Sequence, residues 1–232
     1  MNERIDMIVG ILRLPEADSG DDIVYLCQNV FNVAYIEYSW FEEEDLICDV
    51  LFIACGDVSF DVNKESFKIA SSIKDFVQFG GLVFGFGGGF KLLCLMELLP
   101  GKIVENHDAA FVSRQVFLRS EKELTPLTSG LDKAKPLALC VAHRYGRYRA
   151  SSEELRSIRQ NEQIVFRYCD AQGNTSMGVN IDGSVDNIAA ISNETNTVFG
   201  MMARPERCVH SHYNGDDGLL LFKSIMACSL EK

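Results

Sequence analysis

Three features are scarce in this 232-residue sequence, and each scarcity argues against a class of protein. No stretch reaches the roughly 18 consecutive apolar residues that a membrane-crossing helix needs, so we predict no membrane association. Residues 1–6 read MNERID, which is too polar and acidic for a secretory leader, and we expect a soluble, cytoplasmic protein. Lysine and arginine number 22 against 33 aspartates and glutamates, a net charge of −11. Because phosphate contacts need clustered cations, we predict no nucleic-acid partner.

Cysteine pairs at a redox or metal-binding spacing are also missing. The eight cysteines are scattered without a CxxC motif, and most lie inside apolar runs such as LICDVLF and LALCVAH. We therefore expect buried, reduced thiols rather than a disulfide framework. Cys208, His210 and His212 alternate, but no second group of ligands at a usual zinc spacing accompanies them. We predict a loop or strand with solvated histidines there, and no metal site.

Apolar residues, by contrast, are abundant, at 47% of the sequence, enough for one sizeable core. In the first hundred residues, near-continuous apolar stretches alternate with amphipathic ones. The predicted strands are 7–14, 33–38, 49–54 and 81–86, and the predicted helices are 21–31, 63–79 and 90–99. Such alternation is typical of an α/β fold with a mostly parallel central sheet flanked by helices on both faces.

After residue 101 the pattern changes to strands separated by turns. The strands predicted here, as a mixed extension of the sheet, are 110–119, 137–142, 163–170, 188–192 and 198–202. A last helix, 216–230, begins with two aspartates near its positive end and carries an apolar face. No internal repeat, linker or low-complexity stretch interrupts the chain, so we predict a single domain over residues 1–232.

The glycine-rich stretch after the predicted strand 81–86 is the main candidate site. In open α/β sheets, sites form at the carboxyl ends of strands, where helix N-termini offer free backbone N–H groups. A sharp strand-to-helix turn that presents a nucleophile needs glycines two residues before and after it, because its strained backbone leaves no room for side chains there. Gly85 and Gly89 have this spacing around Gly87.

Motifs along most of the chain are similar to those of one family. Residues 85–91 read GFGGGFK, similar to the family pattern GICNGFQ, and residues 125–130 read TPLTSG, similar to TPFTSG. Residues 163–174 read QIVFRYCDAQGN, similar to QVVFRYVDAEGN, and residues 200–207 read GMMARPER, similar to GMMPHPER. The chain thus resembles the class I glutamine amidotransferases, and among them the glutaminase subunit of phosphoribosylformylglycinamidine synthase.

The resemblance implies a flavodoxin-like fold and a Cys-His-Glu glutaminase of purine biosynthesis that passes ammonia to a synthetase subunit. In that chemistry a thiolate attacks the amide carbon, an imidazole holds and returns the proton, and a carboxylate orients the imidazole. Two backbone N–H groups stabilise the oxyanion. The implied partner is the large synthetase subunit, the small accessory subunit is a further possible one, and no cofactor is expected.

The positions that would carry this chemistry are replaced in this chain. Matched position by position, Gly87 occupies the nucleophile site, Arg204 the histidine site and Glu206 the carboxylate site. Glycine cannot form a thioester, and a guanidinium stays protonated near neutral pH, so it cannot act as a general base. We predict a degenerate triad in which only the orienting acid remains.

The substrate and oxyanion positions differ from the family pattern as well. Lys91 stands where the family has a glutamine that helps to hold the substrate, and Arg144 lies in the stretch that resembles AHGEG. Residues 54–57 read ACGD where the family has PGGF. This leaves Gly56 and the amide of Gly88 as the candidate oxyanion donors.

Three further residues are candidates for a role in the site. Cys55, at a strand's carboxyl end, is the better alternative nucleophile, although packing of a small buried side chain explains it more simply. Cys94 lies about 10 Å along the helix from Gly87, at 1.5 Å per residue, and is expected to point into packing. His143 follows an apolar strand and fits a hydrogen-bonded structural histidine, with a pocket role inherited from the family as the alternative.

Three functions remain open at this point. The chain is first interpreted as a degenerate glutaminase subunit, kept as a binding partner of the synthetase or as a regulator, without glutamine hydrolysis. Alternatively, it works in the synthase complex with free ammonia or with Cys55 as nucleophile. Thirdly, it is a repurposed anion-binding module in which Lys91, Arg144 and Arg204 converge on a helix N-terminus. Against this, Arg204 could simply pair with Glu206 while the other two lie on solvated faces.

Overall fold

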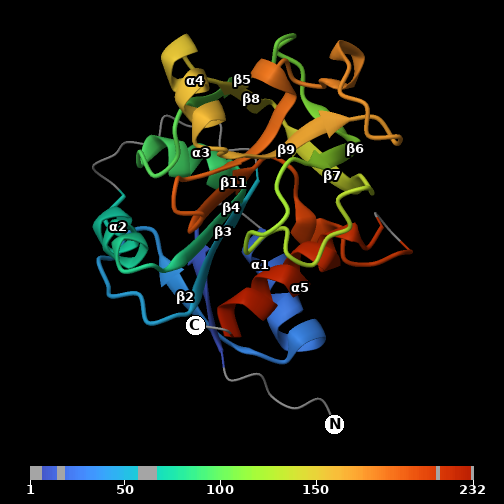
Figure 1. The fold of residues 1–232 in the computed structure, drawn as a ribbon. Coiled ribbons are helices and arrows are strands. Elements are labelled where there is room, and N and C mark those ends of the chain that lie inside the picture. Colours follow the sequence, from blue (N-terminus) through green and yellow to red (C-terminus); the bar gives the residue numbers. More distant parts are fainter. Residues whose placement is uncertain (1–6, 15–18, 57–66, 213–214, 231–232) are drawn as a thin grey trace.

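The structure, a computed structural model, describes residues 7–14, 19–56, 67–212 and 215–230. Within these residues nine strands form the central sheet, in the order β2-β1-β3-β4-β11-β10-β9-β6-β7 (Figure 1). Their bounds are β1 Ile8–Arg13, β2 Ala34–Ser39, β3 Val50–Cys55, β4 Leu82–Gly87, β6 Val112–Ser120, β7 Leu137–His143, β9 Ile164–Cys169, β10 Ile188–Ser192 and β11 Val198–Met201. A separate pair joins β5 (Lys102–Glu105) to β8 (Tyr145–Arg149).

The sheet has a parallel half and an antiparallel half. Strands β2, β1, β3, β4 and β11 pair in parallel, whereas β11, β10, β9, β6 and β7 pair antiparallel. The predicted parallel sheet with a mixed extension is therefore confirmed. Parallel strands end at the same edge, so the carboxyl ends of β3 and β4 lie next to each other, with Cys55 in register with Gly87.

Helices cover both faces of the sheet (Figure 1). Their bounds are α1 Ser19–Tyr25, α2 Ala70–Gln78, α3 Gly88–Leu95, α4 Ser152–Gln160 and α5 Asp217–Leu230, and a π-helix, η1 Leu26–Phe31, continues α1. Side chains of β3 alternate between two hydrophobic clusters: Phe52 packs on the side of α1 and α5, and Leu51 and Ile53 on the side of α2 and α3. This two-sided burial explains why the parallel strands read as continuous apolar runs.

Some predicted elements differ from the structure. The helix predicted at 63–79 begins at Ala70, its first four residues lying outside the described part, and the helix predicted at 90–99 spans Gly88–Leu95. The expectation of only strands and turns between residues 101 and 215 was wrong, because α4 lies there. Ser151 caps α4: its Oγ accepts from the Glu154 amide at 3.2 Å, and the Glu154 carboxylate accepts from the Ser151 amide at 2.7 Å.

Two other predictions bear on the chain as a whole. Among the described residues, no helix is both long and apolar enough to cross a bilayer. The single domain over residues 1–232 stays a prediction, although one sheet carries both hydrophobic clusters.

Candidate functional site

The turn from β4 into α3 has the tight geometry that its glycines predict. Gly87 precedes α3 with φ 58° and ψ −123°, a conformation that side-chain-bearing residues rarely adopt. A Cβ on Gly85 would lie 2.7 Å from the carbonyl carbon of Gly89, and a Cβ on Gly89 would lie 1.8 Å from the carbonyl oxygen of Ile53. The flanking glycines are therefore required by close backbone contacts.

The space beside Gly87 is bounded by two other candidate residues. A Cβ built on Gly87 would lie 2.5 Å from the carbonyl oxygen of Cys55 and 3.8 Å from Cγ of Arg204. Positions that are more than a hundred residues apart in the sequence thus meet at the turn. The contact with the Cys55 carbonyl is too short for an ordinary side chain, so a residue larger than glycine needs the backbone of β3 or of the turn to shift.

The candidate oxyanion donor is engaged within the protein. The amide of Gly88 donates a hydrogen bond to the carbonyl oxygen of Gly56 at 3.2 Å. An oxyanion hole needs amide hydrogens that point at the developing negative charge. Here the carbonyl oxygen of Gly56 accepts the hydrogen of the Gly88 amide. A substrate oxyanion would have to displace this carbonyl oxygen to reach that amide.

Arg204 and Glu206 form a buried ion pair beside this turn. Nε of Arg204 donates to Oε1 of Glu206 at 2.9 Å, and the two side chains are 5% and 0% exposed. Arg204 Nη2 also lies 4.0 Å from Oδ2 of Asp22 in α1, which pairs with Arg207 at 3.1 Å. The prediction that Arg204 pairs with Glu206 is confirmed, and the guanidinium charge is balanced by carboxylates.

Burial and pairing act in opposite directions on Glu206. Burial raises the pKa of the Glu206 carboxyl above its usual value, and the nearby Arg204 charge lowers it in part. Its Oε2 has no hydrogen-bond partner among the described residues. The acid thus depends on Arg204 for its charge compensation rather than on a histidine that it would orient.

The loop that carries this pair is anchored to strand β7. The amide of Arg204 donates to the carbonyl oxygen of Cys140 at 2.9 Å. Pro205 then begins a short 3₁₀ helix, η5 (Pro205–Arg207), where its missing N–H leaves no donor unsatisfied. The turn places the Glu206 side chain beside that of Arg204.

The alternative nucleophiles are both buried thiols. Burial raises the pKa of the Cys55 thiol strongly, and the positive charges of Arg204 and Lys91 offset only part of that rise. Burial likewise raises the pKa of Cys94, whose Sγ donates to the Pro100 carbonyl at 3.8 Å. Since the thiolate is the reactive form, both environments suit packing better than nucleophilic attack.

The remaining cations lie at the edge of the site. Lys91, in the first turn of α3, is half-buried, and its Nζ lies 5.1 Å from the centre of the Tyr145 ring. Arg144, which directly precedes Tyr145, is exposed. The charge of Arg204 is balanced by Glu206. The convergence of Lys91, Arg144 and Arg204 on one anion stays a prediction.

His143 belongs to a separate buried network on the β7 side. Its Nδ1 lies 3.3 Å from Oδ1 of Asn106, and its Nε2 lies 3.9 Å from Oδ2 of Asp182. The hydroxyl of Tyr168 donates to the same carboxylate at 3.0 Å. The expected hydrogen-bonded structural histidine is consistent with this position. Burial raises the pKa of Asp182, against the effects of Ser184 and His143.

Sequence reasoning missed Asp22 and Asp182. Asp22 was assigned only to the start of a helix, and its contact with Arg207 joins residues 185 positions apart, for which one sequence gives no signal. Asp182 lies in a polar turn, NIDGS, and a carboxylate in such a turn usually faces solvent. Nothing in the local pattern indicates that it is 1% exposed.

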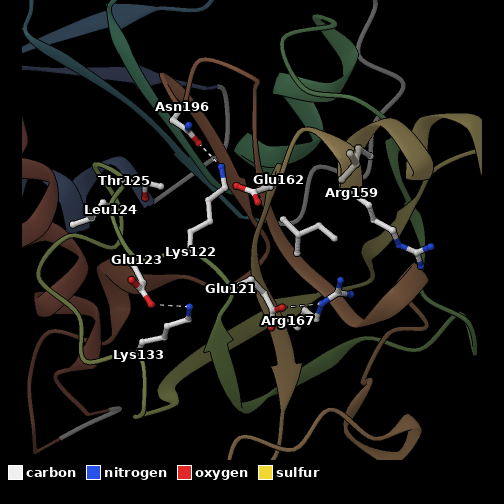
Figure 2. A pocket seen from close by; sticks show the side chains of 12 residues that line it. Glu121, Lys122, Glu123, Leu124, Thr125, Lys133, Arg159, Glu162, Arg167 and Asn196 are labelled. Carbon is white, nitrogen blue, oxygen red and sulfur yellow. Dashed lines mark hydrogen bonds and ion pairs between the residues drawn. The ribbon is translucent and has the colours of Figure 1, made fainter.

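A cavity of about 600 Å³ lies elsewhere on the molecule (Figure 2). The residues that line it include Asn196, which lies in the turn before β11. The cavity therefore lies at the amino end of the parallel strands, not at their carboxyl end. Two ion pairs lie along it, Lys133 with Glu123 at 3.0 Å and Arg167 with Glu121 at 3.4 Å, and Lys122 donates to the amide oxygen of Asn196 at 2.6 Å. Ligand sites in such sheets form at the other edge.

Comparison with known proteins gives consistent matches. The family model described as the CobB/CobQ-like glutamine amidotransferase domain matches residues 53–216. The phosphoribosylformylglycinamidine synthase subunit PurQ of Aquifex aeolicus is 36% identical over 219 residues, covering 92% of this chain and 96% of that protein. The PurQ of Salinibacter ruber is 35% identical over 223 residues, covering 94% of each.

Solved structures share the fold. The structure of PurLQS from Thermotoga maritima contains a chain that superposes with a TM-score of 0.81 at 24% identity, covering 97% of this chain and 99% of that one. A putative GMP synthase subunit from Thermoplasma acidophilum gives 0.60 at 9% identity, covering 98% and 96%. Both likenesses support the flavodoxin-like α/β architecture.

Proposed function

The chain belongs to the CobB/CobQ-like glutamine amidotransferase family and is of the PurQ type within it, and from this premise we propose that it serves in a phosphoribosylformylglycinamidine synthase without hydrolysing glutamine itself. Gly87 is the observation that carries the proposal. It stands at the sharp turn where a nucleophile is expected and offers no atom that could bond to the substrate carbon.

Three neighbouring features support the absence of glutamine hydrolysis. A guanidinium is no general base near neutral pH, and that of Arg204 is held by Glu206 at 2.9 Å. The Gly88 amide is bonded to the Gly56 carbonyl. Cys55, the nearest thiol to the turn in the register, is buried and its pKa is raised. A single substitution therefore does not restore the chemistry.

The intact fold supports a binding role for the same chain. The relatives are named as synthase subunits and match over more than nine tenths of this chain, and the Thermotoga maritima structure is named as PurLQS. We propose that the partner of this chain is the large synthetase subunit, with the ammonia for synthesis supplied free. The accessory subunit is a further proposed partner, and a cytoplasmic location belongs to the same proposal.

The test measures binding and hydrolysis on the same sample. The full chain is mixed with the large synthetase subunit of its own organism, the complex is isolated by size exclusion, and glutamate release from glutamine is followed beside ammonia-dependent synthesis. We expect co-elution, synthesis with ammonium chloride, and glutamate release no higher than in a blank. The PurQ of Aquifex aeolicus with its own large subunit provides the matched comparison for hydrolysis.

Two results would overturn the proposal. Glutamate release that disappears in Cys55→Ser but not in Cys94→Ser would mean that Cys55 is the nucleophile. Failure of the chain to bind the large subunit, when circular dichroism shows it folded, would remove the subunit role.

A further inference from the structure

Cys140 and Cys208 lie in direct contact beside the loop that carries the ion pair. Cys140 is on β7, and Cys208 directly follows η5. The thiol of Cys208 donates to Sγ of Cys140 with a sulfur–sulfur distance of 3.2 Å, and the backbone amide of Cys140 donates to Sγ of Cys208 at 3.1 Å. The Cys140 thiol donates in turn to the carbonyl of Arg204 at 3.6 Å.

This distance is short for two sulfur atoms that are not bonded. A disulfide has a sulfur–sulfur length of about 2.05 Å, so the two atoms need to approach by little more than one ångström. All eight cysteines are free thiols in the structure, and these two are in contact with each other. We propose that Cys140 and Cys208 are a peroxide-sensitive pair that closes to a reversible disulfide and covalently ties the Arg204–Glu206 loop to β7.

The two cysteines differ in a way that assigns their roles. Cys140 is half-buried and Cys208 is completely buried, so an oxidant reaches Cys140 first. The hydrogen bond from Cys208 lowers the pKa of Cys140, against the opposing effects of burial and Glu206, and the charges of Arg204 and Arg207 also lower it. The same contact and burial raise the pKa of Cys208. Cys140 is therefore the thiol that reacts, and Cys208 the one that resolves.

The reaction consumes one peroxide and two thiols. The sulfur of Cys140 attacks one oxygen of hydrogen peroxide, the O–O bond breaks, and the leaving hydroxide takes up the thiol proton as water. Cys140 is then a sulfenic acid. The sulfur of Cys208 attacks that sulfur, the S–S bond forms and the S–O bond breaks, and the second hydroxide leaves as water with the proton of Cys208. Two electrons pass from the thiols to the peroxide, and an added thiol reductant reverses the step.

The other cysteines provide a contrast within the same molecule. Burial raises the pKa of Cys27 to about 12 and that of Cys169 to about 11. Burial also raises the pKa of Cys55, and no other cysteine sulfur is within hydrogen-bonding distance of these three among the described residues. Selective oxidation at the Cys140–Cys208 pair is thus expected from geometry first, and from thiol acidity second.

Trypsin provides a direct assay of the pair. Cleavage after Lys133, Arg144, Arg207 and Lys223 gives the peptides 134–144 and 208–223, each of which contains one cysteine. The full chain is treated with a graded series of hydrogen peroxide, blocked with an alkylating reagent, digested without reductant and analysed by mass spectrometry. We expect the two peptides to appear joined, with a mass about 2 Da below their sum, and to separate on addition of reductant.

Variants distinguish the pair from nonspecific oxidation. Cys140→Ser and Cys208→Ser should each abolish the joined peptide, whereas Cys228→Ser, which also removes one thiol, should leave its yield unchanged. Cys140→Ser should also be free of sulfenic acid at Cys208 at low peroxide, while Cys208→Ser should accumulate sulfenic acid at Cys140. If Cys208→Ser does not fold by circular dichroism, Cys140→Ser, at a half-buried position, carries the test alone.

The oxidised chain should also be more stable. A bond between residues 140 and 208 closes a long loop, and such a cross-link raises the thermal midpoint by about 5 to 10 °C in a chain of this size. A joined peptide formed equally well by other cysteines, or full alkylation of Cys140 and Cys208 after peroxide treatment of the folded chain, would overturn the proposal. Neither result depends on whether the chain hydrolyses glutamine.

Discussion

Replacement of Arg204 by methionine should strongly destabilise the folded chain. The substitution leaves the Glu206 carboxylate buried without the charge that now lies 2.9 Å from it, and its second oxygen has no hydrogen-bond partner among the described residues. Removing one member of a buried pair typically costs about 3 to 5 kcal/mol of unfolding free energy. In a chain of this size that corresponds to a fall of about 6 to 20 °C in the thermal midpoint.

The pH dependence of this loss has a definite sign. Burial raises the folded-state pKa of Glu206, and Arg204 lowers it in part, so Arg204→Met raises it further. An acid with a raised folded-state pKa contributes stability below its unfolded pKa and loses that contribution as the pH rises through the folded pKa. The stability gap between the parent chain and the variant should therefore be smallest near the unfolded pKa of a glutamate, about 4.3, and should widen as the pH rises from there.

Urea unfolding of both proteins across this pH range measures the gap directly. Arg159→Met is the matched control, since Arg159 pairs with Asp186 at 2.8 Å with side chains 56% and 29% exposed. It should cost less than about 1 kcal/mol at any pH. Adding Glu206→Gln to Arg204→Met should recover at least half of the loss, because a neutral amide is easier to bury than a charge. A small gap, or one that does not change with pH, would refute the buried-pair reasoning.

Three further outcomes follow from the same structure. Gly87→Cys should form no covalent adduct with a thiol-alkylating glutamine analogue, because its Cβ would meet the Cys55 carbonyl at 2.5 Å. Adding Arg204→His should give slow labelling at most; rapid labelling by mass spectrometry, or turnover in a glutamate assay, would contradict this. Phosphate should raise the thermal midpoint no more than chloride at equal ionic strength, since Glu206 balances Arg204; a phosphate-specific rise that Lys91→Ala removes would favour the anion-binding alternative. Ser151→Ala should lower the unfolding free energy by about 1 kcal/mol, and Ser152→Ala, outside the cap, by much less.

The parallel half of the fold could be predicted because strands that are buried on both faces need apolar residues at every position. Strands β3 and β4 are buried at every position, so they read as unbroken apolar runs whatever lies on either side. Helix α4 was missed because it carries only two apolar side chains, Leu155 and Ile158, and Ile158 is its one buried side chain. The start of α4 is nevertheless indicated in the sequence by Ser151 and Glu154, which have the spacing of a capping box.

In the candidate site, too, the local backbone geometry could be predicted from the sequence, whereas the contacts between distant elements could not. The spacing of Gly85, Gly87 and Gly89 predicts a tight turn, because glycine is demanded by local backbone contacts that any such turn makes. The partner of Arg204 was predicted as an alternative only, and the contribution of Asp22 not at all, because ion pairs across elements depend on which helix covers which strand edge. Likewise, no local pattern indicates that Gly56 turns its carbonyl toward Gly88.

The geometry of the turn and the chemistry of the site are physically separable. A residue with a side chain in the conformation of Gly87 would cost on the order of 1 to 3 kcal/mol, which catalytic turns sustain because the surrounding structure holds them. With glycine this strain is absent, and the turn is fixed instead by close contacts of Gly85 and Gly89. The carboxyl ends of β3 and β4 can therefore keep their shape without a nucleophile. If the proposed large subunit contacts this edge, Gly87→Ala should weaken its binding, since the new Cβ would push the Cys55 carbonyl, while Cys55→Ser should leave binding unchanged. Equal binding by both variants would show that the large subunit does not contact this edge.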